Sequence, residues 1–160
     1  MDQQGWLYDY QRWIERLCDT HDSVRYTIGH RLRDFDRAER LSVQVVLHML
    51  GKPNVFRYQG LPYSARIGSV AETLLAAKPA DDEKSPDWPT VVAYLEQMPV
   101  PLRLVHVGAF IHGVADDDLI GALGSTTTAS LSRLRIEVQD YLASAATPGD
   151  MGRQKEKPCT

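Results

Sequence analysis

Residues 99–142 constrain the fold more than any other part of the chain, because three apolar stripes at helical spacing follow one another there with short breaks. Each predicted helix can bury its apolar stripe against the stripes of the other two helices. Gly124 has no Cβ, so the second helix can end and turn there, and Ser125 or Thr126 can cap the third. The stretch predicts three helices in a helix-turn-helix order. The stripes are Leu102, Val105, Ala109 and Phe110; Leu119, Ile120 and Leu123; and Leu131, Leu134, Val138 and Leu142.

The third predicted helix presents small polar and basic side chains opposite its apolar stripe. Thr127, Ser130 and Arg133 are three residues apart and share this face, and Arg135 is the other basic residue of the helix. A recognition helix carries its DNA-groove contacts on such a face, so we predict these four residues as DNA contacts. Ordinary helical packing can produce the same pattern, and the prediction therefore depends on the order of the whole run.

The run resembles the C-terminal promoter-recognition region of extracytoplasmic-function (ECF) sigma factors, which are small subunits of bacterial RNA polymerase. In that family a Leu-Pro pair opens an apolar helix, a Gly precedes an acidic helix ending in Leu-Gly, and a Ser/Thr-capped helix contains Ser-Arg-Leu. The resemblance implies that the third helix reads promoter DNA. The matching residues are Met98-Pro99, Gly113, residues 116–118, Leu123-Gly124, Thr126 and Ser132-Arg133-Leu134.

Residues 37–47 are similar to the sigma region that binds the clamp helices of the polymerase. Five positions keep the family pattern: Ala38, Glu39, Leu41, Val45 and Leu47. Arginines replace the two flanking aspartates, and Val43-Gln44 replaces a Gln-Glu pair. Any packed helix would also keep the apolar matches. The residues that the resemblance assigns to polymerase binding are Glu39, Arg40, Val43, Gln44 and Leu47.

Residues 56–63 form an aromatic loop before an apolar helix over residues 64–78. In sigma factors this unit captures unstacked bases of the minus-ten element, with aromatic rings stacking on bases and arginines meeting phosphates. Packing of the aromatic rings into the core explains the loop equally well. The predicted DNA contacts here are Arg57, Tyr58, Tyr63 and Arg66.

The predicted architecture is all-α, with two small helical bundles joined by a linker. The domains are a region-two-like domain over 1–78, a proline-bracketed acidic linker over 79–89, a region-four-like helix-turn-helix domain over 90–145 and a disordered tail over 146–160.

Within the first domain, an aromatic-rich helix over residues 1–23 precedes two further helices in residues 22–50, divided near 34–36. The aromatic side chains in the apolar stripe of the first helix, Trp6, Tyr10 and Trp13, should lie in the core. Asp36 is the expected N-cap of the third helix, with Glu39 at the capping-box position. In the second domain, Leu123 and Leu134 are expected as core residues.

The net charge of −3 is distributed unevenly along the 160 residues. Residues 79–145 carry four Lys or Arg against ten Asp or Glu, which is −6. Few phosphates can be neutralised there, so the free protein should bind duplex DNA weakly. A cytoplasmic protein is expected, because the polar, aromatic N-terminus is unlike a signal peptide and no long apolar run occurs.

The chain shows none of the residue patterns that suggest catalysis. The five histidines lack metal-motif spacing, the two cysteines lie far apart, and no phosphate loop or nucleophile elbow occurs. We therefore expect no enzyme, no metal and no cofactor. The leading hypothesis is a sigma-factor-like transcription regulator whose partners are RNA polymerase core and promoter DNA. The alternative is a degenerate sigma mimic that binds an anti-sigma factor or another regulatory protein, and a helical domain serving an unrelated partner comes third.

Overall fold

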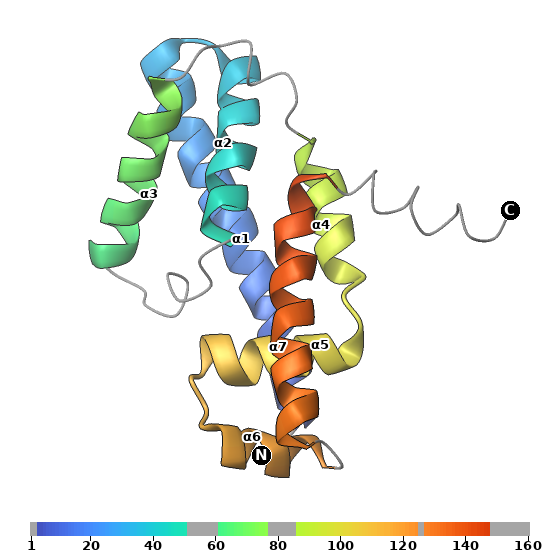
Figure 1. The fold of residues 1–160 in the computed structure, drawn as a ribbon. Helices are drawn as coiled ribbons and strands as arrows, with labels where there is room; N and C mark the ends of the chain where they lie inside the picture. The colour runs from blue at the N-terminus through green and yellow to red at the C-terminus, as the bar shows by residue number, and fades with distance from the viewer. Residues whose placement is uncertain (1–2, 51–60, 77–85, 125–126, 148–160) are drawn as a thin grey trace, which may run out of the picture.

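The computed structural model describes residues 3–50, 61–76, 86–124 and 127–147, with the backbone alone for 61–67 (Figure 1). Every regular element within these residues is helical, which confirms the predicted all-α class. The elements are α1 (Gln3–Leu32), α2 (Phe35–Leu50), α3 (Leu61–Leu75), α4 (Trp88–Glu96), α5 (Val100–Val105), a π-helical turn η3 (His106–Ile111), α6 (Asp116–Leu123), α7 (Thr128–Ala143) and a 3-10 turn η4 (Ser144–Ala146).

One long helix, α1, stands where we expected a helix over residues 1–23 and a separate one after it. The expected break is absent because the buried positions Leu17, His21 and Val24 follow one another at helical steps of four and three. The predicted burial of the aromatic side chains is confirmed, since Tyr10 is 0% and Trp13 1% exposed. The helix ends at Leu32, and the next residue adopts a φ of 54°, in the left-handed conformation that often follows a helix.

The N-cap of α2 differs from the prediction. Asp34, and not Asp36, caps the helix, because its Oδ1 accepts a hydrogen bond from the backbone N–H of Arg37 at 3.1 Å. Asp36 lies one residue inside the first turn, where its charge still favours the positive end of the helix. Glu39 makes no capping box and instead contacts α1 through His21 and Arg25.

The helix α1 contacts helices from both the N-terminal and the C-terminal halves of the chain (Figure 1). Its C-terminal part packs on α2, and α3 packs on α2 and is joined to α1 by the ion pair between Arg31 and Glu72. Its N-terminal part packs on α4, α5 and η3, where the Tyr10 hydroxyl donates a hydrogen bond to the Leu95 carbonyl at 2.6 Å. The helix α7 lies across α5 and contacts α6. The long first helix is therefore shared between the two predicted domains.

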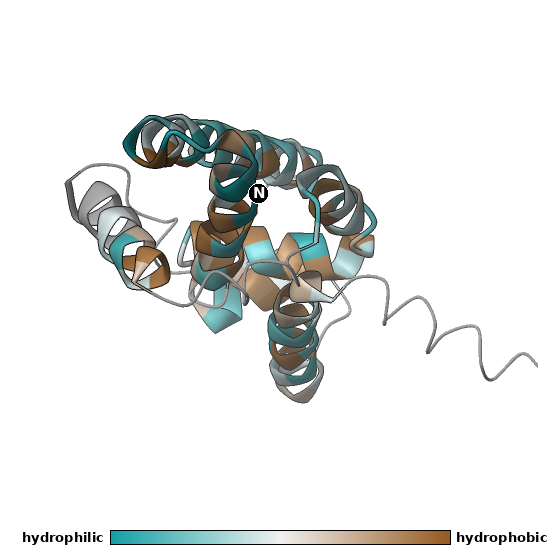
Figure 2. Ribbon diagram, turned by 90° about the horizontal axis from the view of Figure 1, so that it is seen from above, coloured by the Kyte–Doolittle hydropathy of each residue, from teal (hydrophilic) through white to brown (hydrophobic). Residues whose placement is uncertain are grey.

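The buried apolar residues form one continuous cluster that includes side chains from both sides of the predicted linker. Hydrophobic and hydrophilic residues alternate around the helices in Figure 2, as amphipathic packing requires. Trp88, within the predicted linker, is the first residue of α4 and is 9% exposed. The division into two independent domains stays a prediction, because burial does not say whether either half folds alone.

Gly108 allows η3 to approach α1 and α6 closely. A Cβ at this position would lie 2.6 Å from Leu119 Cδ1 and 2.8 Å from ring atoms of Trp6. Both neighbours are buried, so Gly108→Ala should lower the free energy of unfolding by about 1–3 kcal/mol in urea denaturation. The matched control is Gly29→Ala, for which the three atoms nearest to the new Cβ all belong to the Phe35 ring. That ring is 43% exposed and can swing away, so we expect a change within about 0.5 kcal/mol. Equal losses in the two variants would contradict this account.

Candidate functional site

Four of the predicted DNA-binding residues lie on α7 or at its N-cap, and α7 contacts α6. Gly124 ends α6 with a φ of 82°, as its lack of a Cβ allows. The cap of α7 is Thr127, whereas Ser125 and Thr126, the expected capping residues, lie outside the described residues. The helix-turn-helix arrangement stays a prediction.

Two of the predicted groove contacts are hydrogen-bonded to each other at the start of α7. The Thr127 Oγ1 accepts a hydrogen bond from the Ser130 backbone N–H at 3.1 Å and donates one to the Ser130 Oγ at 2.9 Å. Both side chains therefore stabilise the first turn of the helix. Thr127 is exposed and Ser130 is half-buried, so a partner molecule can still reach this end of α7.

The two arginines of α7 have different surroundings. Arg133 is exposed on the outer face of the helix. Arg135 is half-buried and forms an ion pair with Asp116, the first residue of α6. Its guanidinium carbon also lies 5.9 Å from the centre of the Phe110 ring. Arg135 thus joins the start of α6 and the end of η3 to α7, a role that its position in the sequence did not indicate.

The cores of α6 and α7 are centred on Leu119 and Leu131, which are 0% and 1% exposed. Leu123 and Leu134, which we expected in the core, are only partly buried and pack against its edge. The sequence pattern identified the correct faces of both helices. It did not determine which residue of each stripe lies deepest, because that depends on the angle at which the helices cross.

The predicted polymerase-binding residues of α2 do not form one exposed surface. Val43 is 0% exposed, so its side chain contributes to the core. Glu39 accepts hydrogen bonds across to α1, from His21 Nε2 at 3.1 Å and from Arg25 Nε at 3.0 Å. The remaining three, Arg40, Gln44 and Leu47, are partly buried.

The predicted minus-ten residues fall largely beyond what the structure describes. Arg57 and Tyr58 lie outside the described residues. Tyr63 and Arg66 belong to α3, in the part for which only the backbone is described.

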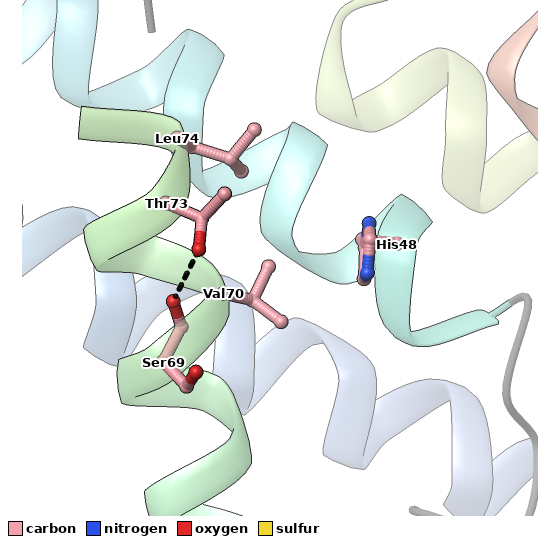
Figure 3. Close-up of a pocket in the computed structure, with 5 residues that line it drawn as sticks. All are labelled: His48, Ser69, Val70, Thr73 and Leu74. Atoms are coloured by element: carbon pink, nitrogen blue, oxygen red, sulfur yellow. Dashed lines mark hydrogen bonds between the residues drawn. The ribbon is translucent and has the colours of Figure 1, made fainter. Parts of the chain in front are cut away.

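A small pocket of about 190 Å³ lies between α2 and α3 (Figure 3). Val70 and Leu74 point from α3 toward α2, and His48 faces them across the pocket. The Thr73 hydroxyl donates a hydrogen bond to the Ser69 carbonyl oxygen at 3.0 Å and so is engaged in its own helix. Among its lining residues, His48 is the one ionisable group, and no carboxylate stands beside it.

The sequence leaves open whether Trp88 docks on either predicted domain or on a partner, and the structure places it against α1. The Trp88 ring stacks on the His21 ring, with 4.5 Å between centroids and 4° between planes. His21 is in turn bonded to Glu39 of α2. Residues from three helices therefore meet at this point, and the chain leaving the predicted linker is attached directly to α1. A lone tryptophan in an acidic, proline-bracketed segment was the available signal, but it did not specify the partner.

No cluster of three or more His, Cys, Asp or Glu suited to a metal ion occurs in the part of the chain that the structure describes. None of its described helices is long and apolar enough to span a membrane. No family model, curated protein or solved structure matches the chain. The similarity to ECF sigma factors therefore rests on the residues quoted above.

Proposed function

We propose that the protein is a sigma-factor-like transcription regulator that directs or modulates RNA polymerase at promoters. The observation that supports the proposal is the order of the helices. Three helices, α1 to α3, precede four further helices, α4 to α7, of which the last two are an acidic helix ended by glycine and a threonine-capped helix. This is the order of helices that the two sigma regions would require. The proposal also includes a cytoplasmic location.

In this proposal Arg133 is the principal DNA contact of α7. It is exposed, whereas Arg135 is held by Asp116 and serves to fix the angle of α7. With a charge of −6 over residues 79–145, the C-terminal helices bind too few phosphates to hold DNA alone. RNA polymerase would therefore have to hold the protein on the promoter, as it does for sigma subunits.

The test is reconstituted transcription with bacterial RNA polymerase core and a library of upstream DNA fragments from the source genome. Arg133→Ala should abolish promoter-dependent transcripts and leave co-purification with polymerase unchanged. Arg12→Ala is the matched control. Arg12 is exposed on α1, so this substitution removes one positive charge outside α7. Absence of both transcripts and polymerase association in the unmodified protein would overturn the proposal.

A second candidate, a sigma mimic that binds an anti-sigma factor or another regulatory protein, is favoured by a specific observation. Glu39 and Arg135, each predicted to contact polymerase or DNA, are ion-paired within the molecule. If this function is correct, the protein should capture a small regulatory protein and no polymerase subunits. Arg133→Ala should leave that capture unchanged. Nanomolar, sequence-specific duplex binding by the free protein at physiological salt would contradict both functions.

A further inference from the structure

His106 is a buried ionisable residue that the proposed function does not use. It is the first residue of η3 and is 1% exposed. Neither of its ring nitrogens has a hydrogen-bond partner among the described residues. A neutral imidazole has one donor and one acceptor, so both are buried without compensation, an arrangement that is rare in folded proteins.

Aromatic rings surround the imidazole on several sides. The Trp13 ring centroid lies 4.3 Å from that of His106 with 61° between the planes, and Tyr10 lies at 5.9 Å and 83°. The ring of Phe110, one turn further along η3, lies at 6.0 Å. These rings exclude water, and they provide no carboxylate to balance a positive charge on His106.

Two arginine side chains contact rings of this cluster, and their positive charges would oppose protonation of His106. From α5, the Arg103 guanidinium carbon lies 5.1 Å from the centre of the Tyr10 ring. From α7, Arg135 lies at 5.9 Å from the Phe110 ring, on which it stacks. From α1, the Tyr10 hydroxyl donates its proton to the Leu95 carbonyl, and Asp9 pairs with His112 at the surface at 2.9 Å. One of the two arginines, Arg135, is paired with Asp116 of α6. Among the described residues, no carboxylate is hydrogen-bonded to His106 to balance its charge when protonated.

The position of His106 makes its charge state relevant to the assembly of the fold. It lies where α1 packs on η3, and Gly108 of the same turn lies against the Trp6 ring. We propose that protonation of His106 opens the contact between α1 and residues 106–111, so that this contact is closed near neutral pH and opens on acidification. The proposal does not depend on the function proposed above.

The direction of the effect follows from the two protonation equilibria. Burial lowers the pKa of His106 from 6.5 to about 3. In the open form the imidazole is hydrated and regains its ordinary pKa, so the open form binds the proton more tightly. As the pH falls below 6.5, the ratio of open to closed molecules should rise about tenfold per pH unit, until the closed form is also protonated near 3.

Amide hydrogen exchange, corrected for the intrinsic rate at each pH, tests the proposal on the full chain between about pH 7 and about pH 4.5. Protection of peptides covering residues 100–111 should fall about tenfold per pH unit, while protection of residues 41–50 in α2 stays constant. His106→Leu, which cannot be protonated, should show no such fall. The control His48→Leu removes an exposed histidine of α2 and should behave like the unmodified protein.

Three outcomes would overturn the proposal: no loss of protection in the unmodified protein, the same loss in His106→Leu, or a simultaneous loss in α2. If His106→Leu fails to fold, NMR titration of the unmodified protein decides instead. The His106 ring signal should then titrate well below its ordinary midpoint and together with the Trp13 indole signal. An ordinary midpoint without a change at Trp13 would reject the proposal.

Discussion

Trp13→Ala should lower the free energy of unfolding by about 3–5 kcal/mol, the largest single-residue effect that we expect in this protein. The Trp13 side chain is 1% exposed in the N-terminal half of α1, where its ring lies 5.4 Å from that of Tyr10 and 4.3 Å from that of His106. Its removal leaves a cavity between α1 and the C-terminal helices that rigid neighbours cannot fill. A loss of this size is a large part of the stability of an ordinary domain.

Urea denaturation followed by circular dichroism measures this effect. The matched control is Tyr8→Ala, an aromatic deletion on the same helix, because Tyr8 is 62% exposed and contacts Arg12 at the surface. We expect a change within about 0.5 kcal/mol for the control. A loss below about 1 kcal/mol for Trp13→Ala would show that α1 does not pack on η3 as described.

Alkaline pH should destabilise the fold steeply above about pH 10, because three tyrosines hold their protons more tightly when folded. Burial raises the pKa of Tyr10 well above its ordinary value of 10.0, and raises that of Tyr141 to about 12. Burial also raises the pKa of Tyr94, whose ring stacks on Tyr141 at 4.3 Å. The hydroxyls of these two donate to each other's backbone carbonyls and so join α4 to α7.

The sign follows from the raised pKa values. The stabilisation is fully present below pH 10, where folded and unfolded tyrosines are both protonated, and it is lost as the pH rises above 10 and the unfolded chain ionises. Tyr10, which is 0% exposed, should contribute about 1.4 kcal/mol per pH unit. Tyr141 is half-buried, and solvent screening reduces its share.

Tyr10→Phe isolates the largest contribution to this alkaline transition. At neutral pH the variant should lose about 1–3 kcal/mol, because the Leu95 carbonyl loses its buried donor. Above pH 10 its stability should fall less steeply than that of the unmodified protein, by about 1.4 kcal/mol per pH unit. Urea titrations between about pH 8 and about pH 11 measure both effects. Tyr26→Phe, at a position 66% exposed, is the control and should reproduce the unmodified slope.

The prediction of helix positions succeeded where a stripe of apolar residues lies between clear stop signals. Gly124 ended α6 as expected, and the aromatic stripe of α1 is buried. The prediction was wrong where it placed a break near residue 22, because a change of composition does not interrupt a helix while the spacing of apolar residues continues. The cap at Asp34 was missed because Asp34 and Asp36 are equally good N-cap residues, and only the backbone path selects one.

The sequence by itself determined the all-α class, most helix faces and the acidic character of the C-terminal half, because these depend on spacing and composition alone. The tertiary structure decided which side chains remain available to a partner. Arg133 and Arg135 are two residues apart on one helix, yet one is exposed and the other is paired with Asp116. The tertiary structure also decided that α1 packs on both halves and encloses His106. Such long-range contacts depend on how the helices cross, and no local pattern encodes that angle.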